Sequence, residues 1–362
     1  MLDELEGSGL EAFITNPPPP LSYTKGRRFT VRSHHPPPPQ RKVSNCCALT
    51  EEGDNERLKV PPLERCLLHP PSPGSPGNLE VEFEIVDEIR AGVYEPAQIL
   101  VVRIIQAPPE FFKKLGSTTQ IVAKFYDTLY WDHSDDGGDP FHYVEHQYTH
   151  EAATYERLTE LQGKIVPIFY GSYSLELPID HPSEASRSVR LIVMEQIHGS
   201  SLLQLKPEDS SQAQRQRIMK LLIDGESAIY THDIVLGDLH PRNVLVEQDK
   251  DAAQQIRRVV HIDFGINMMS RSWWANSDLA SEQRRLPGTF VTPLFRWLKL
   301  FGRELKFRMW VDWDYQRWLE AEYSHTLSAV TPEIRSEYCP EHMHHELDAK
   351  TRELYGIRSA SK

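Results

Sequence analysis

The stretch LGDLHPRNVLV, residues 236–246, holds an acid, Asp238, and an amide, Asn243, in one short loop that leads into an apolar run. Asp and Asn both favour turns, and Pro241 between them fits a turn as well, so the pattern alone is a weak signal. It also has a chemical interpretation. A carboxylate that stays ionised in a loop can take a proton from a hydroxyl, and an amide oxygen a few residues later can complete the coordination of Mg²⁺.

A second stretch, VVHIDFGIN at residues 259–267, places Asp263 after a mostly apolar run that is typical of a buried strand. Gly265 then lets the chain turn sharply. A carboxylate at the end of a buried strand is costly unless it is paired or bound to a metal. The two motifs are joined by a predicted strand, a loop and a second strand. Together they favour phosphoryl transfer, in which a protein mainly positions the acceptor hydroxyl, the phosphates and the metal ions.

These residues resemble the protein-kinase-like superfamily, which includes the protein kinases and the aminoglycoside and choline phosphotransferases. The resemblance implies that Asp238 is the catalytic aspartate and that Asn243 and Asp263 bind the metal ions. Lys124, in IVAKF, matches the strand lysine that holds the α and β phosphates of ATP. Glu151, in HEAATYERL, matches the helix glutamate that pairs with this lysine. The implied cofactors are therefore ATP and Mg²⁺.

The stretch LIVMEQIHG, residues 191–199, is similar to the last strand of the small lobe and the hinge of this superfamily. By this similarity Glu195 and Ile197 would offer backbone groups to adenine, and Val122 on the lysine strand would cover the adenine ring. The similarity extends over about residues 80–270. The motif sequences EAATYERL and GDLHPRNVLV are most similar to a large group of fungal kinase-like proteins whose substrates are unknown.

Two features depart from the protein kinases. The glycine-rich loop is expected near EIRAGVYEPAQ, residues 88–98, but only Gly92 of its three glycines is present. In the catalytic loop, Leu236 and Gly237 stand where protein kinases have His-Arg. The glycine before the aspartate, and His240 after it, match the small-molecule phosphotransferases, whose loop reads HGDLHPGN. The acceptor hydroxyl is accordingly left open between a protein and a small molecule.

The function predicted from these residues is an ATP-dependent phosphotransferase that moves the γ-phosphate of Mg-ATP to such a hydroxyl. The alternative is a pseudokinase that acts as a nucleotide-binding or protein-interaction module. The thin glycine loop and the missing histidine favour the alternative. The presence of all five residues of the resemblance, from the lysine to the second aspartate, favours the enzyme.

The order of strand and helix patterns predicts two lobes, and the resemblance implies that they form an α+β, two-lobed protein-kinase-like fold. A small antiparallel-sheet N-lobe with its hinge is expected over residues 78–197, and a larger helical C-lobe over residues 198–362. Ser211 and Gln214 fit the capping box that begins a helix. The chain beyond residue 270 is predicted to be mostly helical and holds six of the seven tryptophans, which are expected in the core.

Residues 1–77 hold 14 of the 27 prolines, a density that predicts a disordered tail with polyproline II stretches, open to binding partners. Within it, PPSPGSPG at residues 70–77 places Ser72 and Ser75 directly before prolines. This pattern is open to proline-directed phosphorylation, and a passive linker is the other interpretation.

The formal net charge is −12, and residues 1–77 hold equal numbers of acids and bases, so the excess negative charge lies in the rest of the chain. Such a domain is a poor general binder of nucleic acid, because phosphate contacts need Lys and Arg. No stretch approaches the 18 or so apolar residues of a membrane span. The four cysteines show no disulfide spacing, which favours a reducing compartment. We therefore expect a cytoplasmic or nuclear protein.

Two possible metal sites are given little weight. His142, His146 and His150 share one face of a predicted helix, which zinc could use, but a solvated face is the expected outcome. The acidic stretch DHSDDGGDPFHY, residues 132–143, begins like a calcium-binding EF-hand loop. Tyr143 stands where that loop needs a bidentate Glu, so no calcium site is expected there.

Overall fold

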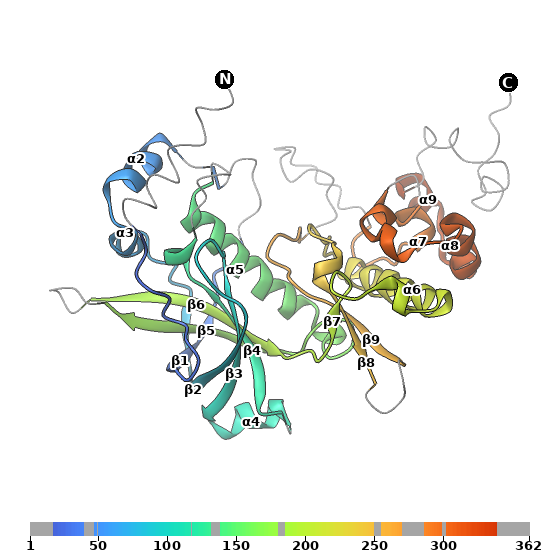
Figure 1. Ribbon diagram of the computed structural model, residues 1–362. Helices are drawn as coiled ribbons and strands as arrows, with labels where there is room; N and C mark the ends of the chain where they lie inside the picture. Colours follow the sequence, from blue (N-terminus) through green and yellow to red (C-terminus); the bar gives the residue numbers. More distant parts are fainter. Residues whose placement is uncertain are drawn as a thin grey trace. The chain divides into compact units, whose positions relative to one another are not determined.

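The chain, seen as a computed structural model, is a mixed α/β structure with its strands concentrated in the N-terminal part and its helices later (Figure 1). It divides into two compact units. Unit 1 runs to Gln162 and includes Pro167–Gln196 and Phe264–Ile266; unit 2 comprises Gly163–Val166, Ile197–Asp263 and the described residues from Asn267 onward. The structure describes residues 17–39, 47–48, 50–116, 118–131, 138–179, 185–249, 255–269, 286–298 and 302–338.

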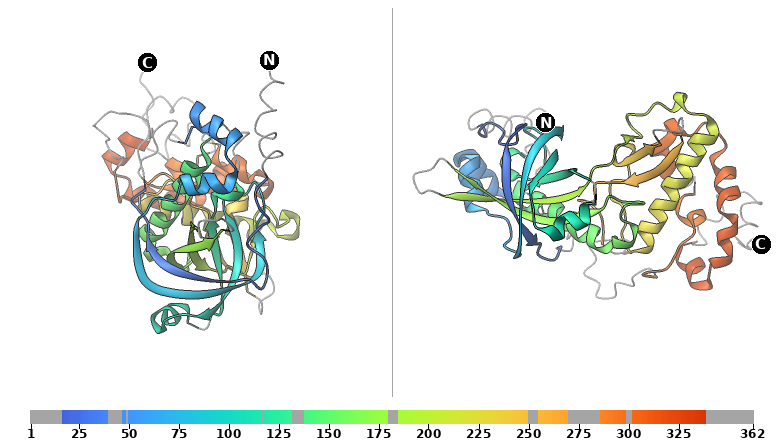
Figure 2. Two further views of the ribbon diagram at one scale, coloured as in Figure 1. Left: turned by 90° about the vertical axis from the view of Figure 1, so that its left-hand side faces the viewer. Right: turned by 90° about the horizontal axis from the view of Figure 1, so that it is seen from below.

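Six strands of unit 1 form a closed antiparallel barrel in the order β1-β2-β3-β4-β6-β5. Strand β1 pairs with β2 on one side and with β5 on the other, so the barrel has no unpaired edge. Inward-facing residues such as Phe83, Leu100 and Phe125 are fully buried and fill the interior, around which the strands curve (Figure 2). The strands are β1 (Arg28–His35), β2 (Ser75–Arg90), β3 (Gln98–Gln106), β4 (Gln120–Tyr126), β5 (Phe169–Pro178) and β6 (Ser186–Glu195).

The prediction of a disordered tail over residues 1–77 is wrong for the described part of that segment. Its strand β1 closes the barrel of unit 1, where a small antiparallel sheet was expected. Proline density hid a short strand pattern: Phe29 and Val31 lie two residues apart and both are buried in the barrel. Two helices follow, α2 (Glu51–Lys59) and α3 (Pro62–Leu68). Residues 1–16, 40–46 and 49 lie outside the described residues.

A buried polar network ties the N-terminal segment to the barrel. Arg187 on β6 donates two hydrogen bonds to Asp127, of 2.6 and 2.8 Å, and the side chains of this pair are only 4% and 1% exposed. The hydroxyl of Tyr23, which precedes β1, donates to the second carboxylate oxygen at 2.6 Å. Burial, and to a lesser extent the Asp127 carboxylate, raises the pKa of Tyr23, so that its hydroxyl keeps its proton.

Helix α5 (Pro140–Arg157) packs against β4, β5 and β6. It begins where Asp139 accepts hydrogen bonds from the amides of Phe141 and His142, with Pro140 in the first turn, as is typical of a helix start. The smaller helical pieces that follow β3 in unit 1 are α4 (Pro109–Leu115) and two 3₁₀ helices, Thr128–Tyr130 and Thr159–Leu161.

Unit 2 is built on α6 (Gln212–Thr231), which begins at the predicted capping box of Ser211 and Gln214. The helix packs against a three-stranded sheet in the order β7-β8-β9. The sheet strands are β7 (Ser200–Ser201), β8 (Val244–Gln248) and β9 (Ile256–His261). The later helices are short: α7 (Pro293–Arg296), a 3₁₀ helix at Arg303–Trp310, α8 (Tyr315–Tyr323), a second 3₁₀ helix at Ser324–Ala329, and α9 (Pro332–Tyr338).

Tryptophans supply much of the core of unit 2, as predicted for this region. Trp297, Trp310 and Trp318 are buried. The indole N–H of Trp297 donates to Glu226 of α6 at 2.9 Å, and the same carboxylate pairs with the guanidinium of Arg296. This buried ion pair holds the segment that carries Arg296 and Trp297 against α6. Trp273 and Trp274 lie outside the described residues.

We expect Asp127→Ala to lower the free energy of unfolding by about 3–5 kcal/mol, because Arg187 would be left as a buried cation without its carboxylate. Urea unfolding of the purified chain measures the change. Glu84→Ala is the matched control in the same barrel: Glu84 pairs with Arg28 and Arg103, whose side chains are about half exposed, so its loss should matter far less. Equal losses in the two variants would contradict the anchoring role of Asp127.

Candidate active site

Unit 1 brings Lys124 and Glu151 together as the sequence predicted. Lys124 lies on β4 and Glu151 on α5, and the lysine Nζ is 2.6 Å from the Oε2 atom of Glu151. The two side chains are 4% and 1% exposed. A buried ion pair of this kind adds little net stability, because desolvation of the two charges offsets most of their attraction. Its presence therefore suggests a task other than holding the fold together.

Sequence reasoning missed a third member of this group, Tyr126. Its hydroxyl donates to the same Oε2 atom of Glu151 at 2.7 Å, and the lysine ammonium lies 5.5 Å from the centre of its ring. Tyr126 stands two residues after Lys124 on β4, so the two side chains leave the strand on one face. That spacing was the available signal, but a tyrosine in a strand is usually a core residue, and the motif of the superfamily gives it no role.

The predicted adenine-binding residues are only partly in place. Val122 is buried on β4, two residues before Lys124 and on the same face, and its register partner on β6 is Met194. The backbone N–H of Glu195 donates to the carbonyl of Ile168 at 2.8 Å, and the Glu195 carboxylate accepts from the Ile168 amide at 3.1 Å. A contact between adenine and the backbone of Glu195 would therefore have to use its carbonyl group. Ile197 begins a segment of unit 2.

The turn between β2 and β3, where the glycine-rich loop was expected, is fastened by its own side chains. Gln98, which is fully buried, accepts from the amide of Gly92 at 2.6 Å and donates to the carbonyl of Gly92 at 3.0 Å. The amide of Tyr94 donates to the carbonyl of Tyr130 at 2.7 Å. The amides of Gly92 and Tyr94, which a phosphate-binding loop would point at a nucleotide, are thus already used within the barrel.

In unit 2 the loop of Asp238 and Asn243 folds back on itself. The 3₁₀ helix Pro241–Asn243 ends the loop, and the Nδ2 atom of Asn243 donates to the backbone carbonyl of Asp238 at 3.0 Å and to its Oδ2 atom at 2.8 Å. With its nitrogen committed in this way, Asn243 is left with its Oδ1 oxygen as the atom that can face a cation. This is the arrangement that the proposed metal ligand needs.

Two further residues of the loop surround the catalytic candidate. The Arg242 guanidinium pairs with the Oδ2 atom of Asp238, so this carboxylate has a cation beside it. The Nδ1 atom of His240 accepts from the amide of Arg242 at 3.3 Å. Burial, together with the nearby Arg242 charge, lowers the pKa of His240, which keeps its ring neutral near pH 7 and able to accept this hydrogen bond.

Asp263 is held beside this loop by the backbone. The amide of Ile262, which lies between the last residue of β9 and Asp263, donates to the carbonyl of Asn243 at 3.0 Å. Asp263 itself has a φ of +65°, a left-handed conformation that is uncommon for a residue other than glycine. Such strain often marks a functional position, because the surrounding structure must hold it. The structure therefore brings the Asp238–Asn243 loop and Asp263 together within unit 2.

A second connection between the two motifs involves Asn267, which sequence reasoning did not single out. Its Oδ1 atom accepts from the amide of Gly237 at 3.1 Å, and its side chain is buried. Met268, the residue after Asn267, exchanges two backbone hydrogen bonds of 2.9 and 3.0 Å with Val235, two residues before Gly237. Asn267 thus fixes the residue directly before Asp238. An asparagine near a turn carries no distinct sequence signal, which explains why it was missed.

The donor set of this site suits a hard cation. Asp238, Asn243 and Asp263 offer only carboxylate and amide oxygens, which Mg²⁺ prefers. Within the described part of the chain, no cluster of three or more His, Cys, Asp or Glu residues is arranged as a metal site. The solvated face expected for the α5 histidines is wrong for His150, which is buried and whose ring stacks on that of His146 with the two centroids 3.9 Å apart. Residues 132–137 of the acidic stretch lie outside the described residues.

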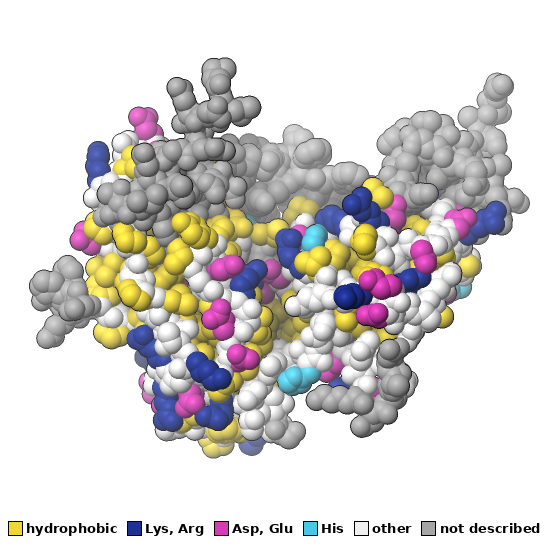
Figure 3. All heavy atoms as spheres, in the orientation of Figure 1, with side chains coloured by type: hydrophobic (Ala, Val, Ile, Leu, Met, Phe, Trp, Pro, Cys, Tyr) yellow, Lys and Arg dark blue, Asp and Glu magenta, His cyan; other side chains and the backbone are white. Residues whose placement is uncertain are grey.

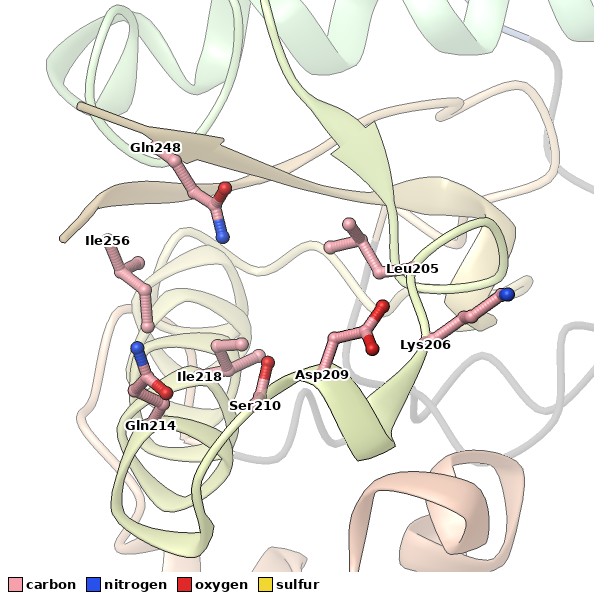
Figure 4. Close-up of a pocket in the computed structure, with 8 residues that line it drawn as sticks. All are labelled: Leu205, Lys206, Asp209, Ser210, Gln214, Ile218, Gln248 and Ile256. Carbon is pink, nitrogen blue, oxygen red and sulfur yellow. The ribbon is translucent and has the colours of Figure 1, made fainter. Parts of the chain in front are cut away.

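Unit 2 also has a small cavity of about 190 Å³ whose lining comes from residues 205–210, from α6 and from the ends of β8 and β9 (Figure 4). None of the residues predicted to form the active site lines it. On the molecular face drawn in Figure 3, basic and acidic side chains of the described residues are interspersed rather than gathered into a basic area. That distribution does not favour a nucleic-acid surface on this face.

A lysine on a barrel strand paired with a helix glutamate, an Asp-x-x-x-x-Asn loop and an Asp-Phe-Gly turn define a kinase-like domain. The comparison with known families agrees: residues 103–273 match the family described as the ABC1 atypical kinase-like domain, a member of the protein-kinase-like superfamily. No curated protein matches the chain. Among the described residues, no helix is both long and apolar enough to cross a membrane.

We expect a double-mutant cycle on the ion pair to show a coupling energy of about 1–3 kcal/mol between the two side chains. Lys124→Met and Glu151→Gln should each lower the free energy of unfolding, because each leaves a buried charge without its partner. Gln still accepts the hydrogen bond of Tyr126, so the double variant should lose much less than the two single losses added together. Unfolding free energies that simply add would contradict a direct pair.

Proposed function

We propose that the protein is an ATP-dependent phosphotransferase that transfers the γ-phosphate of ATP to an acceptor hydroxyl. The observation that carries the proposal is the orientation of Asn243, whose nitrogen is bound by Asp238 so that its oxygen can face a cation. An asparagine can hold a turn in this way in any protein, but here the freed oxygen belongs to the residue that the motif assigns to the metal ion. The buried Lys124–Glu151 pair supports the same proposal.

In this proposal each residue has one role. Lys124, held by Glu151 and indirectly by Tyr126, binds the α and β phosphates. Asp238 accepts the proton of the attacking hydroxyl. Mg²⁺, bound by Asn243 and Asp263, would supply positive charge to the phosphate oxygens.

Arg242 adds a condition to this mechanism. Its guanidinium pairs with the Asp238 oxygen that is also bound by Asn243. The acceptor hydroxyl must therefore reach the other oxygen of this carboxylate, or Arg242 must move. Half of the Arg242 side chain is exposed, so a change of rotamer has little steric obstruction. After such a change the guanidinium could pair with an anionic acceptor or a phosphate.

The second candidate function is a pseudokinase that binds partners without transferring phosphate. One observation favours it: the amides of Gly92 and Tyr94 are already hydrogen-bonded, so the turn between β2 and β3 offers little to a nucleotide phosphate. Thermal unfolding of the chain with ATP, in the presence and absence of Mg²⁺, distinguishes the two functions. A Mg²⁺-dependent rise in the melting temperature supports the enzyme, and the lack of any rise supports the pseudokinase.

We expect Asp238→Asn to keep its affinity for Mg-ATP while losing about 10²–10⁴ of the turnover, because the amide cannot take the acceptor proton. ATP turnover and the metal-dependent shift in melting temperature are measured on the same protein. Mass spectrometry of the chain after incubation with Mg-ATP reports autophosphorylation and so helps to decide between a protein and a small-molecule acceptor.

Asp263→Ala is the matched comparison, because it removes a proposed metal ligand instead of the proton acceptor. It should abolish the Mg²⁺-dependent shift as well as the turnover. Equal turnover in the wild type and in Asp238→Asn would exclude Asp238 as the base and leave the pseudokinase as the better explanation.

A further inference from the structure

The segment between α3 and β2, residues 69–74, has no regular secondary structure and lies against α5; we refer to it as the strap. It is fastened at several points. The Nε2 atom of His34 on β1 lies 2.9 Å from the carbonyl oxygen of Pro73. Gly74 has a φ of +52°, and a Cβ added there would lie 2.4 Å from the carbonyl oxygen of His35, so only glycine fits this turn. The strap is therefore an ordered part of unit 1.

Ser72, at the centre of the strap, faces a cavity of about 360 Å³. The opposite wall is the N-terminal half of α5, including Glu145 and Tyr148, and Arg190 of β6 also lines the cavity. The carboxyl group of Glu145 hydrogen-bonds with Ser72. Ser72 is half-buried and thus lies at a cavity that has room for a larger group.

Arg190 is an unusual residue for such a place. It is 7% exposed, and its guanidinium donates to neutral acceptors: the hydroxyl of Ser174 at 2.6 Å, and the carbonyls of Ser72 at 3.0 Å and of Pro73 at 3.5 Å. Among the described residues, no carboxylate forms an ion pair with it, although its charge lies close enough to Glu145 to lower the pKa of that carboxyl group. A buried arginine without a carboxylate partner is costly, and a doubly charged phosphate beside it would supply the missing charge.

We propose that Ser72 is a phosphorylation site for a proline-directed protein kinase, and that its phosphate binds Arg190 inside this cavity. In the modifying kinase, the Ser72 oxygen forms a bond to the γ-phosphorus of ATP while the bond from that phosphorus to the bridging oxygen of ADP breaks. The proton of Ser72 goes to the base of that kinase, and ADP leaves. Pro73 directly after Ser72 supplies the sequence that such an enzyme recognises.

The negative neighbour, Glu145, does not prevent this arrangement. Burial raises the pKa of Glu145, and hydrogen bonds from Ser72 together with the Arg190 and His142 charges offset this only in part. The carboxyl group can therefore take up a proton and donate a hydrogen bond to the phosphate instead of repelling it. The phosphate would then join the strap, β6 and α5 through one set of charge-assisted hydrogen bonds.

The cavity also adjoins the Lys124–Glu151 pair. Tyr126 lines the cavity, and its hydroxyl is bonded to Glu151. Phosphate bound to the strap should fix α5 and so tighten the binding of Mg-ATP. This last consequence rests on the proposed function, whereas the binding of the phosphate by Arg190 does not.

Ser75 is a matched control within the same motif. It too precedes a proline, but it is exposed and begins β2, where it pairs with His35 and does not line the cavity. The experiment uses the full chain with phosphoserine installed at position 72 or at position 75 during synthesis. Melting temperatures are measured without nucleotide, so a failure here is separate from a failure of the proposed phosphotransferase.

Phosphoserine at position 72 should raise the melting temperature by about 2 °C or more, the effect of roughly 1 kcal/mol in a chain of this size. Phosphoserine at position 75 should leave it unchanged. Arg190→Gln should remove the gain at position 72, and Arg190→Lys, which keeps the charge, should retain part of it. A melting temperature that is unchanged or lowered by phosphoserine 72, or a gain that survives Arg190→Gln, would overturn the proposal.

The assignment as a modification site has its own test. The wild-type chain is incubated with a proline-directed protein kinase and ATP, and the modified residues are mapped by mass spectrometry. Phosphate on Ser72 supports the site. Modification of Ser75 with none at Ser72, even after long incubation, would show that the strap does not open far enough for a kinase and would overturn the assignment.

Discussion

The ion pair between Lys124 and Glu151 imposes the main constraint on unit 1, because a strand and a helix must both be held in place to keep two charges together away from water. The barrel meets this demand. A closed set of strands has little freedom to shear, so β4 presents Lys124 at a fixed position. The packing of α5 on β4, β5 and β6 then sets the position of Glu151, and the Tyr126 hydroxyl donates a second hydrogen bond to the same carboxylate oxygen.

In unit 2 the candidate site residues are held in place by hydrogen bonds instead of a barrel. The loop of Asp238 and the turn after β9 are joined by the Ile262 amide, by the Asn267 side chain and by the backbone pair of Val235 and Met268. The chain at Asp-Phe-Gly then passes from unit 2 into unit 1, where Phe264 packs edge-on against Tyr155 of α5 at a ring distance of 5.1 Å. Phe264, which directly follows the candidate metal ligand Asp263, thus contacts α5, the helix that carries Glu151.

The sequence was sufficient to single out candidate site residues through their resemblance to the superfamily. The structure places Lys124 beside Glu151, and Asp263 beside the loop of Asp238 and Asn243. The supporting residues Tyr126, Arg242 and Asn267 were not singled out, because each acts through one hydrogen bond or ion pair that depends on how the chain returns on itself. The strand β1 was missed for a different reason: proline content describes an average over a segment, whereas a strand needs only a few alternating residues.

The closure of the barrel by β1 also determines when unit 1 can be completed during synthesis. Ser33 on β1 pairs with Tyr173 on β5, so the last seam joins residues that lie far apart along the chain. Contacts of this kind form slowly, because a long loop must be closed before they bring any gain. As the chain leaves the ribosome, β1, β2 and β3 therefore wait with an unpaired edge until β5 and β6 have emerged. Over that interval the nascent chain presents the sort of surface that molecular chaperones protect from aggregation.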